Sequence, residues 1–151
     1  MNTDVKTIEN RLKDLMSKNE DAVKGFKKAA DNAKDKGVKA FFERRAKQRA
    51  LFLKTFRNAA PDLDLGSTAL EGSAAGQMHR AWMDVKSFFT ADDDEAMLEE
   101  AVRGDKAAVE EYNDVLTETM VPQRLKEIIR EQRDEIKNDL ETSKILEDVI
   151  Q

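Results

Sequence analysis

Apolar residues in the first part of the chain recur alternately three and four positions apart. Between Thr3 and about Ala33 the series comprises Val5, Ile8, Leu12, Leu15, Ala22, Phe26, Ala29 and Ala33. In an α-helix this spacing places every member on one face, so the pattern predicts a long amphipathic helix. Gly37, which follows the charged residues 34–36, is interpreted as the signal that ends this helix.

A second helix is predicted from about Val38 to Asn58. Its apolar face carries Val38, Phe42, Phe52 and Phe56. Because only a few residues separate it from the first helix, the two must be antiparallel neighbours.

Two further long helices are predicted in the second half of the chain. The acidic residues 92–95 suit the first turn of a helix, where the helix dipole favours negative charge, and this helix should run to about Met120. Its inward residues are Leu98, Val102, Val109, Tyr112 and Leu116. Pro122 opens the last helix as a first-turn proline. The inward residues of this helix are Leu125, Ile129, Ile136, Leu140, Ser143 and Leu146 or Ile150.

About 35 residues separate the second long helix from the third. After Ser73, which is suited to capping, they include a short helix carrying Met78, Trp82, Val85, Phe88 and Phe89. This connection is long enough to cross the bundle, so the second and third helices should be parallel. Two short hairpins joined by one long crossover is ferritin-like connectivity. The sequence therefore predicts one all-α domain over residues 1–151, a ferritin-like four-helix bundle with a short extra helix in the crossover between helices two and three.

Composition supports a helical fold and argues against several classes of function and partner. The chain is 40% hydrophobic and 38% charged, with only 6 Gly and 2 Pro. Zero Cys excludes disulfides and thiolate chemistry and fits a reducing compartment. The first residues lack the apolar run of a signal peptide, and no stretch approaches the roughly 20 apolar residues of a membrane span. A net charge of −5 argues against nucleic acid and anionic lipid as partners. We therefore expect a soluble, cytoplasmic protein.

Each long helix places a polar residue on its inward face near mid-height. These residues are Asn19, Arg45 and Arg49, Asp105, and Gln132. We interpret them as a buried polar layer in which Arg49 or Arg45 pairs with Asp105 and the two amides lie alongside. Such a layer fixes helix register, although desolvation offsets much of its attraction. In the alternative interpretation, the arginines extend outward to solvent and the amides form local hydrogen bonds.

A metal centre is the other alternative for this layer. Di-iron bundles of this kind take a Glu from each of two helices and a Glu-x-x-His pair from each of the others. The single histidine, His79, has Gly76 three residues before it. A metal site would have to recruit carboxylates alone, from Asp21, Glu43, Asp105 or Asp139, beside two permanently cationic arginines. We therefore predict no metal and no cofactor, with carboxylate-only binding of iron or manganese as the alternative.

The segment His79-Arg80-x-Trp82 is a second candidate site. It combines an imidazole, a cation and an aromatic face near the crossover. The simpler interpretation is that Trp82 anchors the short helix while His79 makes one ordinary hydrogen bond. With no Ser or Cys nucleophile or second ligand in the motif, it is a poor catalytic candidate, and we predict no catalytic residues.

Several short motifs along the chain occur in an order typical of one family. They are Gly25-Phe26 with Ala29-Ala30, Gln48-Arg49 with Phe52, Gly72-Ser73, Gly76-x-x-His79-Arg80-x-Trp82 with Lys86, Leu98-Glu99-Glu100, Arg103-Gly104-Asp105, Tyr112, and Gln132-x-x-x-Ile136. In these the chain resembles an uncharacterised bacterial family of ferritin-like four-helix-bundle proteins, a "domain of unknown function" family. The chain departs from the pattern at Leu140-Glu141, where the family is expected to have His-Asp. The resemblance implies a fold and no established activity.

The sequence thus predicts a non-enzymatic helical bundle that acts as an interaction module, or as a stress-associated one by analogy with ferritin-like relatives. Its partner would be an unknown protein or a second copy of the chain. The adjacent aromatics Phe41-Phe42 and Phe88-Phe89 suggest a homodimer, because neighbouring residues lie about 100° apart on a helix and cannot share one central stripe. One member of each pair could lie beneath the crossover or in a subunit contact.

Overall fold

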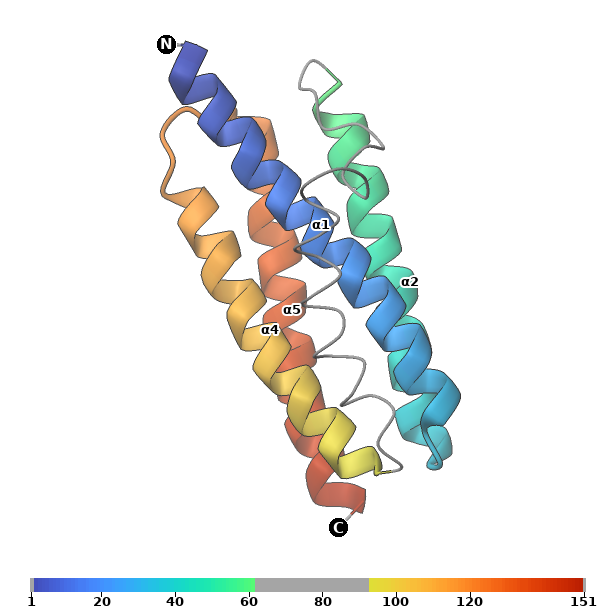
Figure 1. Ribbon diagram of the computed structural model, residues 1–151. Helices are drawn as coiled ribbons and strands as arrows, with labels where there is room; N and C mark the ends of the chain where they lie inside the picture. Colours follow the sequence, from blue (N-terminus) through green and yellow to red (C-terminus); the bar gives the residue numbers. More distant parts are fainter. Residues whose placement is uncertain (1, 62–92, 151) are drawn as a thin grey trace.

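The computed structural model describes residues 2–61 and 93–150, which form four α-helices and contain no strand (Figure 1). The helices are α1 (Asn2–Asn32), α2 (Lys36–Ala59), α4 (Asp94–Leu116) and α5 (Gln123–Ile150). The predicted all-helical fold is therefore confirmed for this part of the chain. The short helix predicted after Ser73 lies outside the described residues.

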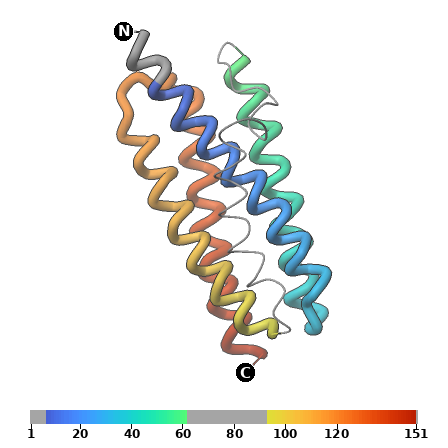
Figure 2. Tube along the Cα trace, in the orientation of Figure 1, coloured from blue at the N-terminus to red at the C-terminus, as the bar shows by residue number. Residues whose placement is uncertain are grey.

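The four helices lie alongside one another as two antiparallel hairpins (Figures 1 and 2). One hairpin is α1 with α2, the other is α4 with α5, and the hairpins also meet through α1 with α4 and α2 with α5. In both views α2 and α4 run in the same direction, and the two ends of the chain lie at opposite ends of the bundle. This is the parallel relation expected from a long connection between them. Of the described helices, none has the length and apolarity needed to cross a membrane.

Aspartates fix the helix starts at one end of the bundle. The Asp35 side chain accepts a hydrogen bond from the Val38 backbone N–H at 3.0 Å, so Asp35 is the N-cap of α2. Gly37 therefore lies inside the first turn of α2, and the prediction that it ends the first helix is wrong. The Asp94 carboxylate accepts from the backbone N–H groups of Lys34 (3.0 Å) and Asp35 (2.8 Å), and ties the start of α4 to the α1–α2 connection.

The third predicted helix is shorter than its apolar pattern suggests. It ends at Leu116 rather than near Met120, because Thr117 caps it: the Thr117 backbone N–H bonds back to Asn113 O, and its hydroxyl donates to Asp114 O at 2.6 Å. A turn then leads to α5, whose first helical residue, Gln123, follows Pro122.

The buried apolar side chains form two clusters along the bundle axis. The first, near the N-terminal end of α1, comprises Ile8, Leu12, Leu15, Met16, Phe52, Leu53, Phe56, Ala60, Tyr112, Val115, Val121, Leu125, Ile129 and Ile136. The second, near the α1–α2 connection, comprises Phe26, Ala29, Ala30, Val38, Phe41, Phe42, Ala46, Met97, Leu98 and Ala101. Between them, at mid-height, lies a set of buried polar residues.

Both aromatics of the Phe41-Phe42 pair are buried. Their ring centroids lie 5.7 Å apart, and Phe42 also stacks on Phe26 at 5.9 Å. Phe41 therefore belongs to the core and offers no free surface for a subunit contact, which removes it from the argument for a homodimer. The Phe88-Phe89 pair lies outside the described residues.

Candidate functional site

The structure places all five residues of the predicted polar layer in the interior. Asn19 comes from α1, Arg45 and Arg49 from α2, Asp105 from α4 and Gln132 from α5, and each is at most 3% exposed. The two arginines point inward, so the alternative in which they reach solvent does not describe the structure. The layer draws one or more side chains from every described helix.

Asp105 is the acceptor for both arginines. Its Oδ1 atom lies 2.8 Å from Arg45 Nη2 and 3.0 Å from Arg49 Nη2. Arg45 also approaches a second carboxylate, because its Nε lies 3.1 Å from Asp139 Oδ2 in an ion-pair contact. Arg44, at the surface, donates to the other oxygen of Asp139 at 2.7 Å. Two buried arginines thus face two buried aspartates, and their charges balance.

Hydrogen bonds extend the ion pairs into a closed ring around the bundle. Arg49 Nη1 donates to Asn19 Oδ1 (2.8 Å), and Asn19 Nδ2 donates to the Tyr112 hydroxyl (2.9 Å). The Tyr112 hydroxyl donates to Gln132 Oε1 (2.8 Å), and Gln132 Nε2 donates to the Phe52 carbonyl (3.3 Å). The ring leaves α2, passes through α1, α4 and α5, and returns to α2. A one-turn slip of any helix would break it, so it specifies the register of all four.

Burial sets the proton affinities in this layer. Desolvation lowers the pKa of the Arg49 guanidinium, and the nearby Asp105 charge opposes that shift. Desolvation raises the pKa of Tyr112 to about 12, against the smaller opposing effects of Arg49 and the Asn19 hydrogen bond. The phenol therefore keeps the proton that it donates to Gln132.

Two members of the layer are absent from the sequence-based set. The sequence predicts only an inward position on the apolar face for Tyr112, and offers Asp139 only as a metal ligand. Asp139 is seven residues after Gln132, and Ser143 follows one turn later, so the heptad spacing of α5 was the available signal. Nothing in the sequence indicated that Arg45 would face two aspartates from different helices.

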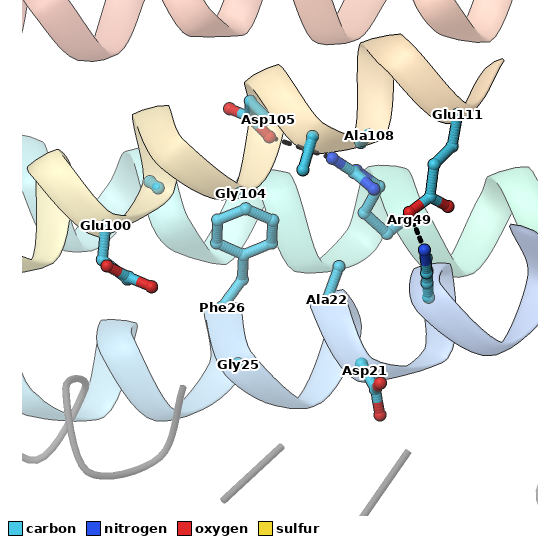
Figure 3. Close-up of a pocket in the computed structure, with 13 residues that line it drawn as sticks. Asp21, Ala22, Gly25, Phe26, Arg49, Glu100, Gly104, Asp105, Ala108 and Glu111 are labelled. Carbon is cyan, nitrogen blue, oxygen red and sulfur yellow. Dashed lines mark hydrogen bonds and ion pairs between the residues drawn. The ribbon is translucent and has the colours of Figure 1, made fainter. Parts of the chain in front are cut away.

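A pocket of about 270 Å³ opens beside the layer, between α1 and α4 (Figure 3). Small residues line it from both helices: Ala22 and Gly25 from α1, and Ala101, Gly104, Ala107 and Ala108 from α4. Figure 3 shows the Phe26 ring between these helices and Arg49 reaching in from α2 toward Asp105. An ion pair between Lys18 and Glu111 joins the two helices beside it. We call this the α1–α4 pocket.

The layer does not fit a pair of metal ions. Such a pair needs about four carboxylates with oxygens free to coordinate. Here Asp105 Oδ1 already accepts from two guanidinium groups, and both Asp139 oxygens lie beside arginine nitrogens. Of the other carboxylates considered, Glu43 is exposed and Asp21 lies half-buried at the α1–α4 pocket. No cluster of three metal-binding side chains occurs within residues 2–61 and 93–150.

The second candidate motif is not placed by the structure, since His79, Arg80 and Trp82 lie outside the described residues.

Comparison with known proteins gives one relationship. No curated protein matches the chain, and neither does any solved structure. A family model matches residues 7–118, a range that includes most of α1 and all of α2 and α4. It contains four of the five predicted layer residues, namely Asn19, Arg45, Arg49 and Asp105. Because this match covers more than half of the chain, the protein belongs to the family described as "Domain of unknown function (DUF2383)".

Proposed function

We propose that this protein is a non-enzymatic binding module built on a ferritin-like bundle. In this proposal a charge-balanced ion-pair layer stands at the height where ferritin-like proteins hold metal. The observation that carries the proposal is the pairing of buried Arg45 and Arg49 with Asp105, at 2.8 and 3.0 Å. Two guanidinium groups at that height repel cations and occupy the carboxylate that a metal would need.

A binding role rather than catalysis fits the chemistry of the chain. The sequence has no Cys and a single His, and the buried acids and bases of the layer neutralise one another. A paired, desolvated carboxylate is poorly placed to exchange protons with a substrate. The absence of cysteine suits a reducing compartment, so a cytoplasmic location is part of the proposal.

The partner we propose is protein, with a second copy of the chain as the first candidate. Ile145 and Val149, one turn apart on α5, are 61% and 72% exposed. Neighbouring exposed apolar side chains favour a subunit or partner contact. Light scattering should give twice the mass of one chain, and Ile145→Ser combined with Val149→Ser should return it to the single-chain mass. A single-chain mass for the unsubstituted protein at every concentration would refute the homodimer.

Elemental analysis tests the metal-free layer. Protein purified without chelator should carry iron and manganese far below one ion per chain, and added Fe²⁺ or Mn²⁺ should leave its melting temperature unchanged. Near-stoichiometric metal that is lost in Asp105→Asn would overturn the proposal in favour of a carboxylate-only metal protein. Asp31→Asn, which makes the same change at an exposed aspartate outside the candidate ligand set, is the matched control.

A further inference from the structure

The α1–α4 pocket has the dimensions and lining of a small-molecule site. Its volume is about 270 Å³, and an apolar cavity of about 150 Å³ already holds one benzene ring. The lining is mainly apolar, formed by alanines, glycines and the ring of Phe26. A Cβ atom added at Gly104 would meet no atom of the described residues within 4 Å. The pocket therefore has room for a body of one or two rings.

Two buried polar atoms of residues that line the pocket lack a hydrogen-bond partner among the described residues, Arg49 Nε and Asp105 Oδ2. Arg49 is 3% exposed and lines the pocket, yet only its Nη1 and Nη2 atoms form hydrogen bonds, to Asn19 and Asp105. Its Nε–H has no acceptor within residues 2–61 and 93–150. A buried donor without an acceptor is costly, and a bound ligand or an ordered water would remove that cost. Arg49 Nε–H is thus a donor, and Asp105 Oδ2 an acceptor, available to an occupant of the pocket.

The charges around the pocket favour a neutral occupant. Three of the lining carboxylates already face a basic group: Glu111 pairs with Lys18, Glu100 with Arg103 and Asp105 with Arg49. An anionic ligand would meet these acids, and a cationic one would meet Arg49. A neutral molecule with one acceptor oxygen avoids both and satisfies the free donor.

We propose that the α1–α4 pocket binds a small neutral molecule with an apolar, preferably aromatic body and one acceptor oxygen, which accepts a hydrogen bond from Arg49 Nε. This inference goes beyond the proposed function, whose partner is a protein, and adds a separate small-molecule site between α1 and α4. The apolar body packs against Phe26 and the alanines, and the oxygen is oriented by the guanidinium that Asp105 and Asn19 hold in place.

The test compares three compounds that share a two-ring body. They are the neutral ketone 2-acetylnaphthalene, 2-ethylnaphthalene, which lacks the oxygen, and the anion 2-naphthoate. Titration of the full chain, followed through backbone amide signals in NMR, should show the ketone shifting residues 22–26 and 101–108. The ketone should bind about tenfold more tightly than the ethyl compound, the ratio expected for one buried hydrogen bond to a charged donor. The naphthoate should bind more weakly than the ketone.

Two leucine variants locate the site. Gly104→Leu fills the pocket while replacing a helix-interior glycine with a better helix former, so it should stay folded and weaken ketone binding at least about tenfold. Ala40→Leu adds the same side chain at an exposed position of α2 and should leave binding unchanged. Arg49→Lys, which removes the Nε donor, should abolish the preference for ketone over ethyl compound.

Three outcomes would overturn the inference. In the first, the ketone does not bind at millimolar concentration, so an ordered water is the only occupant. In the second, Gly104→Leu binds the ketone as tightly as the unsubstituted chain does. In the third, the ketone and the naphthoate bind with equal affinity. None of these bears on the metal content of the layer, so this inference can fail while the proposed metal-free layer stands. If metal analysis instead overturned the layer, the ketone titration would still report on the pocket.

Discussion

Removing the Asp105 carboxylate tests how much the buried ion pairs of the polar layer contribute to the free energy of unfolding. Asp105→Ala leaves Arg45 Nη2 and Arg49 Nη2 without their shared acceptor in a position that is 1% exposed. Breaking a buried ion pair by removing one partner costs about 3–5 kcal/mol, because an uncompensated charge stays behind. Asn19 still accepts from Arg49 and Asp139 still faces Arg45, so the loss should lie near the lower end, at about 3 kcal/mol. That is a large share of the roughly 5–15 kcal/mol that stabilises a typical domain.

The assay is urea unfolding followed by circular dichroism, with a thermal melt alongside. For a chain of this length, about 3 kcal/mol corresponds to a melting temperature lower by roughly 6–12 °C. Asp105→Asn keeps an acceptor oxygen and should lose less. The control is Lys144→Ala, whose 3.6 Å contact with Glu141 is exposed and should contribute less than about 0.5 kcal/mol. A loss below about 1 kcal/mol in Asp105→Ala would show that the arginines are hydrated, and would refute the reasoning.

Three further predictions concern single side chains. Tyr112 is the only tyrosine in the sequence, so phenolate absorbance measures the ionisation of this residue alone. Tyr112 should ionise only near pH 12 or on unfolding, and ionisation near pH 10 in the folded chain would contradict its burial. Desolvation raises the pKa of Asp21 from 3.8 to about 6, so Asp21 favours folding at low pH and that contribution is lost as the pH rises through about 6. Asp21→Asn should therefore gain stability relative to the unsubstituted chain between about pH 4 and pH 6 in urea titrations, and a constant difference over that window would contradict the shift. Gly104→Ala should raise the free energy of unfolding by about 0.5–1 kcal/mol, because alanine favours the helix and the added Cβ meets no atom of the described residues within 4 Å; a destabilised variant would contradict the pocket.

Helix periodicity predicted most of the fold. The long apolar stripes located all four described helices, and the long crossover predicted that α2 and α4 are parallel. The helix ends were less accurate, because they depend on single hydrogen bonds. Asp35 caps α2, so this helix begins at Lys36, one residue before Gly37. Thr117 caps α4, which therefore ends at Leu116. A capping side chain, a glycine and an apolar pattern can each indicate a different end for the same helix. The sequence alone does not show which of these signals decides the end.

The polar layer was predicted in its membership and only partly in its geometry. A polar residue on an otherwise apolar stripe is a strong local signal, and it located Asn19, Arg45, Arg49, Asp105 and Gln132. Which arginine pairs with which carboxylate depends on how the four helices are aligned along the bundle axis. The sequence pattern of a single helix does not contain that information. The α1–α4 pocket was not predicted, because it arises from small residues on two helices far apart in sequence.

The inward placement of the two arginines is the central claim, and NMR of arginine side chains measures it most directly. Arg45 and Arg49 should each give guanidinium Nη proton signals that exchange slowly with water and are resolved by restricted rotation, since both side chains are held by Asp105. Lysine substitution at each position should remove one set of signals, and Asp105→Asn should shift both. If every arginine gave only rapidly exchanging, averaged signals, the arginines would lie in water and the buried ion-pair layer would be wrong.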